Sequence, residues 1–196
     1  MIDTIISNMK YVFLIISVII MLISKIGAKL DYLSIRDIII NHLKCFRKND
    51  NSRWLWLPIL NYNLVPILLG ISATLFKEIN TEIINIITVI MSILTAMLFT
   101  TLTMVIDMKA KINSNNSYYR TEYEISKKAI IETYYTVMYE IVISIIILIA
   151  CLFCIYIEKY YFVFSLIIYS LSFLLLFNLF MIIKRLFKVI NTNINK

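Results

Sequence analysis

The chain alternates long apolar stretches with short polar ones, and five of the apolar stretches carry no charged residue: 11–24, 54–76, 83–106, 141–157 and 160–183. A helix needs about 17 to 25 apolar residues to cross a hydrocarbon core about 30 Å thick. Four stretches have that length. The first stretch reaches that length only if the Lys25 side chain snorkels to the membrane interface and the helix continues to Ala28. The pattern therefore predicts an all-α, polytopic membrane protein with four to five transmembrane helices, at about 9–28, 54–76, 83–106, 141–157 and 160–183.

The distribution of positive charge predicts the orientation of these helices. Lys10, Lys77 and Lys159 lie in one set of polar segments, and all other Lys and Arg lie in 25–53, in 107–140 and after 183. Because Lys- and Arg-rich loops stay in the cytoplasm, these three segments and the C-terminus are expected there. With five spans the N-terminus lies outside, and with four it stays inside.

The first stretch also has to be distinguished from a signal peptide. Ile26 to Ala28 does not offer small residues at both positions that a cleavage site needs. We therefore expect this segment to be retained.

The polar segment 29–53 mixes apolar side chains with basic ones. This mixture is typical of a helix that lies in the cytoplasmic membrane interface. Its basic side chains are then candidates for binding anionic headgroups: Arg36, Lys44, Arg47 and Lys48. A linker helix packed on other loops is the alternative.

The segment 107–140 is predicted to form a long helical extension in the cytoplasm. A loop is expected at Asn113 to Ser117, and no Gly or Pro follows before Ile157. One helix is therefore expected from about residue 120 into the fourth span, roughly 55 Å long, with about half of it in the cytoplasm. One face carries Tyr123, Ile130, Tyr134 and Val137, which could dock a cytoplasmic protein or pack on the chain's own loops.

Two predicted spans carry features beyond hydrophobicity. Pro58 and Pro66 interrupt the 54–76 span, which indicates a kink that is either merely tolerated or used as a hinge. In the 83–106 span, small side chains recur every four residues on one face: Thr88, Ser92, Ala96 and Thr100. Such a face predicts a helix-packing seam, and a polar pore wall only if oligomers arrange it around an axis.

Composition excludes several functions. The chain is 61% hydrophobic and has only two Gly, so it has no material for a glycine-rich phosphate loop. Its Cys151-x-x-Cys154 lies within an apolar span, where two buried small hydrophobic residues are expected. With no Asp, Glu or Arg inside the predicted spans, ion-coupled transport is disfavoured.

One weak catalytic pattern is present in the basic segment. Arg36 and His42 fit a loose Arg-x5-His arrangement found in certain dimeric ribonucleases. Any basic helix with one histidine can produce it, and a solvated or headgroup-facing histidine is the preferred interpretation. We expect no enzyme activity, no cofactor, no metal and no direct nucleic-acid partner.

The stretch from Ser92 to Asp107 and the closing stretch from Phe177 to Leu186 resemble segments of small multi-span proteins of bacterial antiphage systems. The similar types are the transmembrane effectors of retrons and the membrane subunit of the Kiwa system. The resemblance implies an inner-membrane protein that a partner keeps inactive until infection, and that then disrupts the membrane or signals through it.

The leading hypothesis is therefore an oligomeric membrane-perturbing effector or sensor subunit in the bacterial inner membrane. Its expected partners are the lipid bilayer, further copies of the chain and a cytoplasmic protein. One alternative is a non-catalytic scaffold or regulatory subunit that docks a cytoplasmic protein, and another is a small transport or immunity protein.

Overall fold

The computed structural model describes Ile16, Ile19 and residues 35–46, 56–114, 120–156 and 161–194. The elements in these ranges are helical, as predicted: α2 Arg36–Lys44, α3 Trp56–Ile59, the π-helical turn η2 Leu60–Leu64, α4 Val65–Phe76, α5 Thr81–Ser114, α6 Arg120–Tyr156 and α7 Tyr161–Ile194. The chain forms two compact units, Met1–Asp37 and Ile38–Lys196. The helical bundle described below belongs to the second unit.

Three helices are long and apolar enough to cross a membrane, over Thr81–Ala110, Lys127–Ile155 and Phe162–Lys188. They correspond to the third, fourth and fifth predicted spans. The second predicted span, 54–76, is covered by α3, η2 and α4, in which Leu60–Phe76 forms a shorter apolar helix. The first predicted span, at about 9–28, lies outside the described residues apart from Ile16 and Ile19, which are both helical and exposed.

The long helices continue beyond the apolar stretches that predict them. α5 runs to Ser114 and α7 to Ile194, whereas the predicted spans end at 106 and 183. The added charged residues include lysines, which are good helix formers and do not end a helix. α6 is uninterrupted from Arg120 to Tyr156, which confirms the single helix expected there. Its first half packs against α5, where Ala129 and Ile130 share a buried cluster with Val105.

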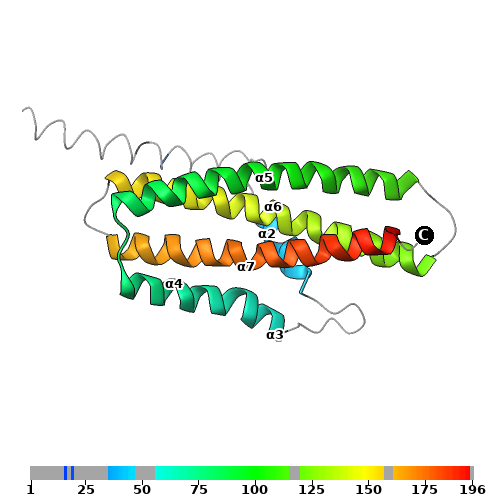
Figure 1. Cartoon of the computed structure of the whole chain (residues 1–196), viewed down its shortest axis with the longest axis horizontal. Helices are drawn as coiled ribbons and strands as arrows, with labels where there is room; N and C mark the ends of the chain where they lie inside the picture. The colour runs from blue at the N-terminus through cyan, green and yellow to red at the C-terminus, as the bar shows by residue number, and fades with distance from the viewer. Residues whose placement is uncertain are drawn as a thin grey trace, which may run out of the picture. The chain divides into compact units, whose positions relative to one another are not determined.

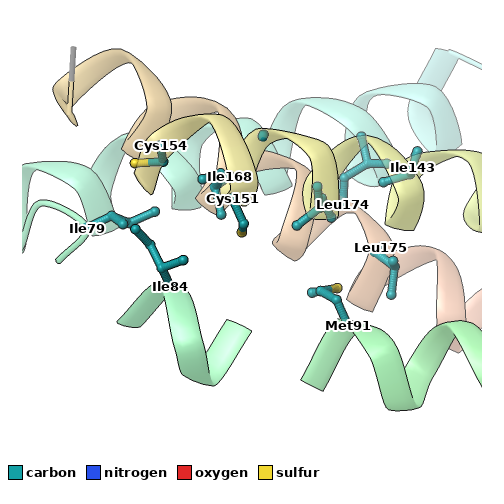
Figure 2. Packing of buried hydrophobic residues seen from close by; sticks show 11 residues of the cluster. Ile79, Ile84, Met91, Ile143, Cys151, Cys154, Ile168, Leu174 and Leu175 are labelled. Atoms are coloured by element: carbon teal, nitrogen blue, oxygen red, sulfur yellow. The ribbon is translucent and has the colours of Figure 1, made fainter. Parts of the chain in front are cut away.

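α6 runs antiparallel to both α5 and α7, so consecutive long helices alternate in direction (Figure 1). α6 packs against both α5 and α7, and α4 packs against α7. Figure 2 shows a buried cluster to which the α4–α5 connection and helices α5, α6 and α7 contribute: Ile79, Ile84, Met91, Ile143, Ile147, Ala150, Cys151, Cys154, Ile168, Leu174 and Leu175. Cys151 and Cys154 are thus buried among apolar side chains, as predicted.

α4 contacts α7 through small side chains. Its buried residues Pro66, Gly70 and Thr74 recur every four residues and so share one face. A Cβ placed on Gly70 would meet Ser170 Cα at 2.5 Å and Ser170 N at 2.6 Å. The two backbones therefore approach so closely that only glycine fits. α4 thus packs on α7 through a small-residue face, while the seam predicted on α5 stays a prediction.

The π-helical turn η2 lies between the two prolines of the predicted kink. Pro66 has no N–H to donate to the carbonyl four residues earlier, which disfavours a regular α-helix at this point. Asn63 Nδ2 donates to the Ile59 carbonyl at 3.0 Å within the widened turn. The turn borders a hollow of about 300 Å³ lined by Asn61, Tyr62, Val65, Phe177 and Phe180. Hinge motion at Pro58 and Pro66 stays a prediction.

Candidate functional site

Most of the predicted seam on α5 is exposed in the part of the chain that the structure describes. Ser92, Ala96 and Thr100 are exposed, and Thr88 is half-buried. Ser92 Oγ donates to the Thr88 carbonyl at 2.8 Å, and Thr100 Oγ1 donates to the Ala96 carbonyl at 3.1 Å. The hydroxyls are therefore satisfied by their own helix. None of the other described helices covers these three exposed side chains, so the face is available for packing.

The predicted docking face of 107–140 is mostly internal. Ile130 and Val137 have 2% and 0% of their surface exposed, and Tyr134 is half-buried against the cluster of Val105, Ala129 and Ile130. The side chain of Tyr123 lies outside the described residues. Ile130 and Val137 thus hold α6 inside the bundle, because α5 and α7 are long enough to cover them.

The basic helix α2 differs from its predicted form at His42. Arg36 and Lys44 are exposed, as headgroup binding requires, and Arg47 and Lys48 lie outside the described residues. His42 was expected in solvent or at headgroups, but only 2% of its surface is exposed. Its ring stacks on Tyr139 of α6 with centroids 4.1 Å apart. The expectation fails because α2 packs on α6 through this side chain.

Burial makes His42 and Cys45 poorly ionisable. Burial and then the nearby Arg185 charge lower the pKa of His42 to about 4. The pKa of the Cys45 thiol is raised, chiefly by burial, and its Sγ donates to the Asn41 carbonyl at 3.3 Å. A neutral imidazole on an aromatic ring and a protonated thiol stabilise packing and do not indicate catalysis.

Because the His42 ring is buried in its neutral form, we expect its contribution to the free energy of unfolding to be lost in mild acid. The unfolded chain protonates this imidazole near its ordinary pKa of 6.5, whereas the folded chain does so only near 4. The stability that the neutral ring provides is therefore complete above pH 6.5 and falls as the pH is lowered towards 4, by up to about 3 kcal/mol. Melting curves of the purified wild type and of a His42 variant across this window measure the loss as the difference between the two proteins.

The matched variant is His42→Phe, which keeps a ring on Tyr139 but cannot bind a proton. Relative to the wild type, its stability should be constant above pH 6.5 and should rise as the pH falls towards 4, because the groups that both proteins share cancel in the comparison. A variant with the same acid sensitivity as the wild type would show that another group is responsible.

Arg185 of α7 connects two helices at one end of a buried polar array. Its Nη1 donates to Thr136 Oγ1 at 2.5 Å and to the Glu132 carbonyl at 3.1 Å. Its Nη2 lies 3.5 Å from Glu132 Oε2, and Lys128 Nζ lies 3.8 Å from Glu132 Oε1. The guanidinium is thus held by both the backbone and side chains of α6.

Glu140 and Asn178 form the second part of this array. Glu140 has 0% and Asn178 has 2% of its surface exposed. Asn178 Nδ2 donates to Glu140 Oε1 at 2.7 Å. Glu140 Oε2 and Asn178 Oδ1 have no hydrogen-bond partner within the described ranges. Glu140 lies within the apolar stretch Lys127–Ile155, which begins before the predicted span 141–157.

The sequence contained a signal for this array that the hydropathy pattern concealed. Glu132, Thr136, Glu140 and Ser144 recur every four residues along one face of α6. Because Glu140 directly precedes the charge-free stretch 141–157, it is assigned to the cytoplasmic segment on hydropathy alone. Its partner Asn178, a single amide inside a span, has no such periodic signal.

The array offers carboxyl, amide, hydroxyl and guanidinium groups but no recognisable catalytic triad or metal centre. Among the residues that the structure describes, no group of three His, Cys, Asp or Glu side chains could hold a metal ion. No family model matches the chain, and the searches of curated proteins and of solved structures found no match.

Proposed function

We propose that this protein is a bacterial inner-membrane effector or sensor subunit of an antiphage defence system. It acts as an oligomer, is held inactive by a cytoplasmic partner and perturbs the membrane when released. α3 to α4 adds a fourth span to the three long helices, and the segment at about 9–28 adds a fifth if it crosses. The Lys- and Arg-rich segments support a cytoplasmic C-terminus, because such segments stay inside.

The observation that carries this proposal is the exposed face of α5. Of the three long apolar helices, α5 is covered least: 17% of its most apolar window is buried, against 39% for α6 and 33% for α7. Its exposed Ser92, Ala96 and Thr100 are small enough to let a second α5 approach closely. The hydroxyls can stay bonded to their own helix or bond across an interface.

The scaffold alternative receives less support from α6. Ile130 and Val137, which were its candidate docking residues, are buried inside the bundle. A cytoplasmic partner would have to contact other surfaces, such as the exposed Arg36 and Lys44 of α2. The exposed face of α5 does not specifically favour the transport or the immunity alternative.

The test of the effector proposal is induction of the chain alone in a bacterial host, followed with a voltage-sensitive dye. The wild type should depolarise the membrane rapidly and stop growth. Ser92→Leu combined with Ala96→Leu should abolish both effects, because larger side chains keep α5 helices apart.

The matched control is Ile90→Leu combined with Met97→Leu, on an exposed side of α5 away from the seam. This control should remain fully toxic, and immunoblots of membrane fractions should show equal insertion of all three proteins. Full toxicity of the Ser92/Ala96 variant at equal insertion would rule out the seam.

A further inference from the structure

One proton can account for both unpartnered oxygens of the Glu140–Asn178 pair. An ionised carboxylate only accepts hydrogen bonds, so it cannot satisfy the Asn178 carbonyl oxygen. A proton on Glu140 Oε2 turns that atom into a donor, and Asn178 Oδ1 is the free acceptor on the side chain already bonded to Glu140. One proton shared between these two atoms would satisfy both buried oxygens, whereas leaving them unpaired would be costly.

Neighbouring hydroxyls on the same face of α6 do not supply that donor. Thr136 Oγ1 donates to the Glu132 carbonyl at 2.8 Å and accepts from Arg185. Ser144 Oγ donates to the Ile141 carbonyl at 2.8 Å. Each hydroxyl has one proton, and both protons are used elsewhere.

The charged and titratable groups around Glu140 do not neutralise it either. On α7, Arg185 is bonded to Glu132 and Thr136, and on α2, His42 is stacked on Tyr139. Tyr139 adjoins Glu140 on α6, and Tyr62 on η2 lies near Phe46 of α2. α5 has no charged residue between Glu82 and Asp107. In the described part of the chain, no cation is paired with the Glu140 carboxyl.

A bound metal ion is a weaker explanation of the same oxygens. Hard cations such as Ca²⁺ take about six to eight oxygen ligands, and Mg²⁺ takes six. The buried pair offers two free oxygens, and the described residues contain no cluster of three metal-binding side chains. A proton needs only the two atoms that are present.

We propose that Glu140 and Asn178 form a proton-binding site that holds α6 against α7. In the closed bundle Glu140 is a neutral acid, and its Oε2–H donates to Asn178 Oδ1 while Asn178 Nδ2 donates to Glu140 Oε1. When the helices separate and water enters, the carboxylic acid becomes a carboxylate and water accepts the proton. Separation therefore releases one proton per site, and alkaline conditions favour it.

The first test is the infrared spectrum of the full-length protein in lipid nanodiscs at neutral pH. The wild type should show the C=O stretch of a protonated carboxylic acid, which shifts in D₂O and disappears in Glu140→Gln. Glu132→Gln is the control, because it removes an α6 carboxyl that is paired with Arg185 and should leave the band intact. A wild-type spectrum without this band, or a band that survives in Glu140→Gln, overturns the proposal.

Thermal melting provides a second test with a different readout. Gln reproduces both the donor and the acceptor of a neutral acid but cannot release a proton on unfolding, so Glu140→Gln should melt at or above the wild-type temperature at neutral pH, with a gap that widens as the pH rises. It should also lack the loss of stability that the wild type shows from neutral to alkaline pH. A wild-type melting temperature that depends on Na⁺ against choline, with the dependence lost in Glu140→Gln, assigns the site to a cation and overturns the proposal.

Asn178→Leu keeps the proposal falsifiable if Glu140→Gln does not fold. This variant retains the acid but removes its partner, so the carboxyl band should move to higher frequency. An unmoved band contradicts the pair. All these measurements use the isolated protein, and failure of the membrane-depolarisation test would leave their outcome unaffected.

Discussion

Gly70→Ala is expected to separate α4 from α7 and to destabilise the protein by about 1 to 3 kcal/mol or more. The new methyl group would lie 2.5 Å from Ser170 Cα and 2.6 Å from Ser170 N, and backbone atoms cannot move aside as a side chain can. At an open helical position the same change stabilises by about 1 kcal/mol, so the sign of the effect is informative. Unfolding of the purified wild type and variant in mixtures of mild detergent and SDS measures this change in the free energy of unfolding.

The matched control for this variant is Ser72→Ala, at an exposed position two residues along α4. It should change stability little. Adding Ser170→Gly to Gly70→Ala removes only the clash with Ser170 Oγ, so it should rescue the loss in part. A Gly70→Ala protein as stable as the wild type would mean that α4 does not lie this close to α7.

Arg185→Ala is expected to cost about 2 kcal/mol and to loosen the contact of α6 with α7. Removing one partner of a fully buried ion pair costs roughly 3 to 5 kcal/mol. The cost is lower here because 14% of the Arg185 and 23% of the Glu132 side chain are exposed. The loss includes the hydrogen bonds to Thr136 Oγ1 and to the Glu132 carbonyl. Detergent unfolding and proteolysis rates of the purified protein check it.

Lys184→Ala is the control for net charge, because Lys184 is the exposed neighbour of Arg185. It removes one positive charge without a buried contact and should cost less than about 0.5 kcal/mol. The stability of Arg185→Lys should lie between the stabilities of Arg185→Ala and Lys184→Ala. Lysine keeps the charge but lacks the planar guanidinium that can donate to several acceptors. Equal stability of the Arg185→Ala and Lys184→Ala proteins would show that the guanidinium contacts contribute nothing.

Two contacts between α6 and α7 and one exposed face of α5 lead to separate predictions under the proposed function. Arg185 with Glu132 and Asn178 with Glu140 both join α6 to α7, while α5 leaves its small-residue face exposed. In the proposed function, release from the partner would break the Arg185–Glu132 and Asn178–Glu140 contacts. Assembly into oligomers would use the exposed face of α5. Variants of Glu140 and of Ser92 should therefore alter different steps, which depolarisation and infrared measurements distinguish.

The sequence by itself determined the features that depend on neighbouring residues. Apolar stretches of 17 or more residues gave the three long helices, and the absence of Gly and Pro after Ser117 predicted the uninterrupted α6. Pro66 marked the place where the regular helix gives way to a π-helical turn. These outcomes follow from helix propensity and backbone hydrogen bonding, which act over a few residues.

Only the tertiary structure decided which faces are internal. In α5, Ile84 is buried and Ile86 is exposed, although both are isoleucines in the same apolar stretch. Lipid tails are as apolar as a protein core, so hydrophobicity does not distinguish a lipid-facing side from a packed one. Tertiary structure also decides three specific contacts: Gly70 with Ser170, His42 with Tyr139 and Glu140 with Asn178. Each depends on the register between two helices far apart in sequence, which no single helix encodes.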